Sequence, residues 1–124
     1  MGSKLRGRRI AVGVADESLR GTLRKSLEFE SADVRSHATA DGLLADVASS
    51  APDLCIVDAD LTDLPGPDLV ARVQERAGGV PVVVVSAHLD AREAGQTSGM
   101  PILPLPFTRR QLVDLILRLL GAKD

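Results

Sequence analysis

Short strand-like runs alternate along this chain with stretches in which apolar residues recur every three or four positions. A continuous apolar run is typical of a strand covered on both faces, whereas the longer spacing is typical of an amphipathic helix. Their regular alternation predicts repeated βα units around a buried parallel sheet. The predicted strands are residues 9–14, 34–37, 54–57, 80–85 and 102–105, of which 34–37 is the weakest.

Capping residues and glycines indicate where the helices begin and end. Ser18 and Asp41 are the expected N-caps of the first and second helices. Thr108, with Gln111 three residues later, has the capping-box pattern and begins the last helix. Residues 90–99 contain two glycines and little apolar periodicity, so the fourth helix is expected to be short.

Length and composition limit the kind of protein that this is. The 124 residues suffice for one domain with its own core, expected at 9–121 after a flexible N-terminal segment at 1–8. A net charge of −2 gives no long-range attraction to nucleic acid or anionic membranes, so neither is an expected partner. No apolar stretch approaches the roughly 20 residues that span a bilayer, and no signal-peptide pattern is seen. A cytoplasmic protein is expected, with Cys55 as a buried thiol.

Polar residues follow several of the predicted strands. In open α/β sheets, ligands bind beyond the carboxyl ends of the strands. Residues 14–17, Asp58, Ser86 and Leu105 are therefore expected to face one another at that edge. Asp58 also begins the acidic segment 58–63, so any chemistry of this chain is expected there.

The order and spacing of these elements resemble the receiver domain of bacterial response regulators over nearly the whole chain. The most specific stretch is residues 54–69, Leu-Cys-Ile-Val-Asp-Ala-Asp-Leu-Thr-Asp-Leu-Pro-Gly-Pro-Asp-Leu. In the resemblance, Asp58 stands at the phospho-acceptor position, Ser86 at the Ser/Thr switch position and Leu105 at the lysine of a Lys-Pro-Phe motif. The resemblance implies a CheY-like, flavodoxin-like α/β fold: a doubly wound, five-stranded parallel sheet of order 2-1-3-4-5.

Two functional elements of that family are replaced in this chain. Val14 and Ala15 stand where the family has the acidic pair that binds Mg²⁺, and Leu105 stands where it has the lysine. Phosphoryl transfer depends on a metal and a cation to neutralise developing charge. The replacements predict a pseudo-receiver of a two-component or phosphorelay system. Such a module is not an enzyme, needs no cofactor or metal, and binds proteins without phosphorylation of Asp58.

Two alternatives remain open. In the first, Asp16 or Glu17 joins Asp58 to form a shifted Mg²⁺ site, and the domain accepts a phosphoryl group. In the second, residues 54–62 form the Asp-x-Asp-x-Thr motif of haloacid-dehalogenase-type phosphatases, which they also resemble. Asp58 would then be the nucleophile and Asp60 the general acid, although the downstream lysine and later acidic pair of that family do not appear.

The last helix carries more apolar side chains than docking on a sheet requires. They cover about 200° of its circumference, whereas docking needs a little over 100°. The surplus residues, Val113, Leu117 and Leu120, are expected to lie beside the short fourth helix. The fourth helix, fifth strand and last helix resemble the usual interaction face of receiver domains. A protein partner or a second copy of the chain is therefore expected to bind there.

Overall fold

The structure, a computed structural model, describes residues 4–58, 66–86, 101–104 and 107–121. The predicted fourth helix at 90–99 lies outside these ranges. Within them, no helix is both long and apolar enough to cross a membrane. In chain order the elements are β1 (Arg9–Gly13), α1 (Glu17–Phe29), β2 (Asp33–His37), α2 (Ala40–Ser49), β3 (Leu54–Asp58), α3 (Gly66–Ala77), β4 (Val82–Ser86), β5 (Ile102–Pro104) and α5 (Arg109–Leu119).

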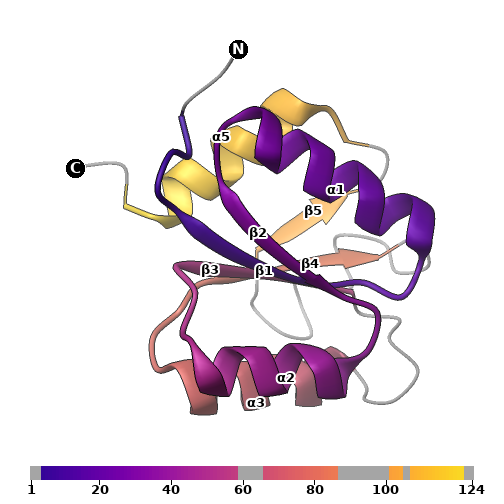
Figure 1. The fold of residues 1–124 in the computed structure, drawn as a ribbon, viewed down its shortest axis with the longest axis vertical. Coiled ribbons are helices and arrows are strands. Elements are labelled where there is room, and N and C mark those ends of the chain that lie inside the picture. Colours follow the sequence, from indigo (N-terminus) through magenta and orange to yellow (C-terminus); the bar gives the residue numbers. More distant parts are fainter. Residues whose placement is uncertain (1–3, 59–65, 87–100, 105–106, 122–124) are drawn as a thin grey trace.

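The strands form one parallel sheet in the order β2-β1-β3-β4-β5. Figure 1 shows α1 and α5 over one face of the sheet and α2 and α3 over the other. The flavodoxin-like parallel α/β architecture predicted from the sequence is confirmed, with β2, β1, β3 and β4 in the predicted order. The edge strand β5 is only three residues long and pairs with β4.

The central strand β3 shows why the sheet is buried on both faces. All five of its residues are buried. Successive side chains of a strand point to opposite faces, so they enter two separate apolar clusters. Leu54 and Ile56 belong to the cluster under α1 and α5, and Cys55 and Val57 belong to the cluster above α2. The continuous apolar run in the sequence reflects this double covering.

The N-caps of the first two helices differ from the prediction. Asp16, not Ser18, caps α1, and Thr39, not Asp41, caps α2. Each side chain accepts a hydrogen bond from the backbone N–H three residues later, at 2.7 Å for Asp16 and 3.1 Å for Thr39. The residues that cap have extended backbone just before the helix, whereas Ser18 and Asp41 already lie in the first turn.

Residues 4–8 belong to the segment at 1–8 that was predicted to be flexible, and in the structure they pack against the domain. Leu5 is fully buried in the cluster under α1 and α5. Its N–H donates to the carbonyl oxygen of Glu30 at 3.0 Å, and the N–H of Arg8 donates to the Leu5 carbonyl at 3.0 Å. Gly7 has a φ of 79°, a conformation that suits glycine in such a turn. An apolar side chain surrounded by basic ones thus holds residues 4–8 in place.

The last helix begins as predicted but is rotated differently about its axis. The capping box of Thr108 and Gln111 is confirmed. Val113 is only 2% exposed and lies in the core, so the prediction that it forms a partner surface is wrong. Leu117 and Leu120 are partly buried against the same cluster. The physical reason is that α5 packs against α1 as well as the sheet, which turns inward a different set of side chains: Leu112, Val113 and Ile116.

Candidate functional site

The carboxyl ends of three strands bring predicted site residues to one edge of the sheet. The register of β1 with β3 places Val14, which follows β1, next to Asp58 at the end of β3. Ser86 ends β4, the strand on the other side of β3. Leu105 follows β5 and lies outside the described residues. The backbone therefore assembles the predicted edge from Val14, Asp58 and Ser86.

The phospho-acceptor position is a nearly buried carboxylate. Asp58 is 6% exposed. Among the described residues, Glu30 is the only other buried charged residue. Taking a charge out of water is unfavourable unless partners compensate it. A phosphoryl group would add a charge of about −1.5 to −2 at neutral pH, so this position would need strong positive compensation to carry one.

The loop between β1 and α1 begins with two residues whose side chains have no metal-binding atom. Val14 is fully buried in the apolar core, and Ala15 is exposed. Arg20 donates from Nη1 to the carbonyl oxygens of both residues, at 2.9 and 3.1 Å. The side chains of Val14 and Ala15 carry no oxygen ligand, and the guanidinium places a fixed positive charge against the loop, which opposes a metal cation close by.

Arg20 contacts this site, and the sequence patterns did not predict that contact. It lies in the first half of α1, and only the folded helix brings its guanidinium back over the preceding loop. Its spacing of four residues from Asp16, one helical turn, is the only local signal of this position. A single arginine at that spacing is too common on exposed helices to predict a contact with the loop.

The two acidic residues that follow Val14 and Ala15 belong to the start of α1. Asp16 caps α1, where its carboxylate is also favoured by the helix dipole. Glu17 is exposed in the first turn of α1. Among the described residues, no three carboxylate, histidine or cysteine side chains gather into a group that could hold a metal ion. The described residues therefore do not fit Mg²⁺, which requires carboxylates held in place among its oxygen ligands.

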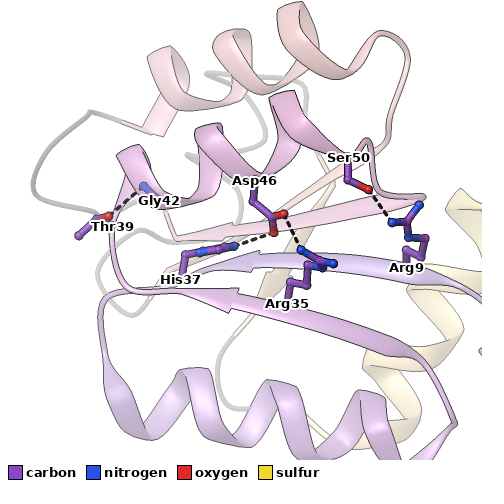
Figure 2. A network of polar contacts seen from close by, with 7 residues as sticks. All are labelled: Arg9, Arg35, His37, Thr39, Gly42, Asp46 and Ser50. Atoms are coloured by element: carbon purple, nitrogen blue, oxygen red, sulfur yellow. Dashed lines mark hydrogen bonds and ion pairs between the residues drawn. The ribbon is translucent and has the colours of Figure 1, made fainter.

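A second polar cluster joins α2 to the edge strand β2, as Figure 2 shows. Asp46 of α2 lies 2.7 Å from Nε2 of His37 and accepts a hydrogen bond from Nη1 of Arg35 at 3.3 Å. Arg35 and His37 are two positions apart on β2, so both face α2. At the end of α2, Arg9 donates to Ser50. The Asp46 side chain is 9% exposed, so Arg35 and His37 compensate a nearly buried carboxylate. Their contacts also attach β2 to α2.

Cys55 lies in the buried middle of β3, as the sequence predicted. Burial, with a smaller contribution from the negative charge of Asp46, raises the pKa of its thiol from 9.0 to about 12. The thiolate is the reactive form of cysteine. At neutral pH Cys55 is therefore an unreactive, protonated core residue.

We expect Cys55 to react with a thiol reagent at pH 8 only after the protein unfolds, because the folded thiol is both protonated and covered. The free energy of unfolding should also fall as pH rises from about 9 to about 12, since the unfolded thiol ionises before the folded one. Colour release from a disulfide reagent, with and without denaturant, measures the first effect. A Cys55→Ser variant that shows the same pH dependence would contradict the second.

One family model and several curated proteins match the sequence of this chain. A family model described as the response regulator receiver domain matches residues 14–117. The DNA-binding transcriptional regulator NtrC of Rhizobium meliloti is 30% identical over 118 residues, which are 93% of this chain and 24% of that protein. NtrC of Proteus hauseri is 29% identical over 106 residues, 83% of this chain and 22% of that protein. The chain spans about a quarter of the length of these relatives.

Solved structures show the same fold. NtrX from Brucella abortus superposes with a TM-score of 0.84 at 24% identity, covering 93% of this chain and 27% of NtrX. The receiver domain of a sensor histidine kinase from Pseudomonas aeruginosa PAO1 superposes with a TM-score of 0.82 at 21% identity, covering 93% and 98%. That receiver was solved with a magnesium ion coordinated in its active-site cleft.

Proposed function

Because the chain belongs to the response regulator receiver domain family, we propose that it acts in a bacterial two-component or phosphorelay pathway without phosphorylation of Asp58. In this proposal the domain is a pseudo-receiver that works by binding other proteins, without catalysis and without a cofactor. The observation that supports it is the β1–α1 loop. There Val14 is buried, Ala15 has no ligand atom in its side chain, and Arg20 occupies the carbonyl oxygens of both.

Charge balance is the physical reason. Stabilisation of a transferring phosphoryl group comes from metal ions and cationic side chains aimed at its oxygens. The sequence has Leu105 in place of the family's lysine, and no lysine between Lys25 and Lys123. Asp58, at 6% exposure, would then carry the added negative charge without either compensation. We therefore expect Asp58 to remain unmodified.

The second candidate is a phospho-accepting receiver with a shifted metal site, and the retention of Asp58 itself favours it. It requires Asp16 or Glu17 to turn toward Asp58. For Asp16 this means giving up the cap of α1, which contributes about 0.5–2 kcal/mol to stability. The phosphatase alternative is set aside, because the receiver family model covers the same motif within its match over residues 14–117.

We expect the intact mass of the protein to be unchanged after incubation with acetyl phosphate and Mg²⁺, because neither a metal ligand pair nor the lysine is present. An adduct of about 80 Da, the mass of one phosphoryl group, that disappears in an Asp58→Asn variant would contradict the pseudo-receiver proposal. A receiver domain with an intact acidic pair, treated in parallel, is the positive control.

An Asp16→Asn variant separates the two candidates if an adduct forms. Asparagine caps a helix about as well as aspartate but is a poorer ligand for a hard cation. Loss of the adduct in Asp16→Asn, with an unchanged thermal melt, would identify Asp16 as the shifted ligand.

Receiver domains act through other proteins, such as kinases or effector domains. For this chain we propose that a partner or a second copy uses the face at the fourth helix, β5 and α5. On α5, only Leu117 and Leu120 support this face as a binding surface, because they are partly exposed. Val113 is part of the core. Since the chain spans about a quarter of its NtrC relatives, the partner can also be a domain of the same polypeptide.

A further inference from the structure

We propose that the N-terminal turn and the first turn of α5 form a docking surface for an acidic segment of a partner protein. We name this surface the basic hollow. Its cations are Lys4, Arg109 and Arg110, which line a cavity of about 230 Å³ together with Glu30, Val113 and Asp114. It contains none of the residues of the carboxyl edge around Asp58, so the inference goes beyond the proposed function.

The N-terminal turn holds one side of the basic hollow in place. Leu5 is fully buried, and its N–H donates to the Glu30 carbonyl at 3.0 Å. The N–H of Lys4 also donates to the Glu30 carboxylate at 3.3 Å. The exposed side chains of Lys4 and Arg6 are therefore attached to a fixed turn. The charge of Lys4 stays beside α5, because Lys4 lines the same cavity as Arg109 and Arg110, instead of being spread over the volume that a free tail explores.

The first turn of α5 forms the other side of the basic hollow. Its two arginines lie where helices usually avoid positive charge. Cations near a helix N-terminus interact unfavourably with the helix dipole. Arg109 has local compensation: its guanidinium carbon lies 3.8 Å from the centre of the Phe29 ring, and its Nε lies 3.9 Å from Glu30. The side chain of Arg110 is 90% exposed and lies 4.0 Å from an exposed Asp114, a pair that adds little stability.

Arg110 thus places a positive charge at an unfavourable helix position without an evident structural gain. Such placements are expected where a residue serves binding instead of folding. At this helix end the capping box occupies the N–H groups of Thr108 and Gln111, and the side chains of Arg109 and Arg110 carry the positive charge. What these side chains attract is negative charge.

Several features favour an acidic protein segment over a nucleic acid. The whole chain carries a net charge of −2, so it offers no extended positive field to a long nucleic acid. Glu30 and Asp114 interrupt the cations within the hollow. Phe29 is 42% exposed and stacks with Arg109, and aromatic residues and arginine are enriched in protein interfaces. A short peptide with carboxylates around an apolar residue matches this combination.

Fluorescence anisotropy tests the inference with a fluorescein-labelled peptide of glutamate and aspartate around a central leucine. A Lys4→Glu/Arg110→Glu variant reverses two charges of the basic hollow. An Arg72→Glu/Arg76→Glu variant makes the same change in net charge on exposed positions of α3. Thermal melts of both variants establish that they remain folded. A peptide with glutamine and asparagine in place of the acids controls for apolar binding.

We expect the first variant to bind the acidic peptide at least about tenfold more weakly than the wild type, and the α3 variant to stay within about twofold. The wild-type affinity should also fall as salt is raised. No binding of the acidic peptide by the wild type, or equal weakening in both variants, overturns the proposal. Tighter binding of a short DNA duplex than of the peptide overturns it as well. None of these measurements depends on whether Asp58 is phosphorylated.

Discussion

A Val113→Glu substitution is expected to remove much of the free energy of unfolding of the protein. Val113 is 2% exposed and lies in the core beside Leu112 and Ile116. A carboxylate placed there loses most of its hydration among the apolar side chains of the cluster, and the cations that line the adjacent basic hollow are expected to compensate it only in part. The expected loss of about 4 kcal/mol or more is comparable with the whole stability of a domain, about 5–15 kcal/mol. Circular dichroism during urea unfolding measures it.

A matched variant on the same helix separates core position from helix propensity. Gln111 is exposed, and glutamate at its position preserves the capping box, so Gln111→Glu should leave the unfolding midpoint nearly unchanged. If Val113→Glu stays folded and instead loses self-association or partner binding, α5 presents the surface that its apolar excess predicted.

A Leu5→Ala substitution is expected to lower the free energy of unfolding by about 2–5 kcal/mol, the usual range for truncating a buried leucine. Leu5 is fully buried and packs in the cluster under α1 and α5, although only four residues precede it. Its loss leaves a cavity and loosens the turn whose N–H groups bond to Glu30. Urea unfolding monitored by circular dichroism gives the change directly.

The neighbouring Lys4 offers the control, because its side chain is exposed and only its backbone N–H bonds to Glu30. Lys4→Ala should change stability by no more than about 0.5 kcal/mol. Equal midpoints for Leu5→Ala and the wild type would mean that the N-terminal segment contributes nothing to the fold, as the sequence had suggested.

Both variants address places where local sequence patterns were misleading. Leu5 stands alone among Lys4, Arg6 and Arg8, so no apolar periodicity indicates that it reaches the core. On the last helix, periodicity predicts which residues share a stripe but not which edge of a broad stripe faces the sheet. The contact of α5 with α1 decides that rotation, and it brings Val113 inward.

The sequence by itself determined the features that depend on neighbouring residues. Apolar runs and helical spacing indicated the parallel α/β fold, because the periods of strands and helices are local properties of the chain. The position of Asp58 at the end of a buried strand followed from the same run. The replacement of the acidic pair by Val14 and Ala15 is a matter of residue identity, which does not depend on how the chain packs.

Only the tertiary structure decided what each nearby polar group does. The helix position of Asp16 depends on where α1 begins, and the hydrogen bond that it accepts from the Leu19 N–H shows that it caps the helix. The convergence of Lys4 with Arg110 joins segments that sequence spacing does not relate. Such contacts depend on how helices rotate and dock, and the packing of the whole core sets those angles and positions.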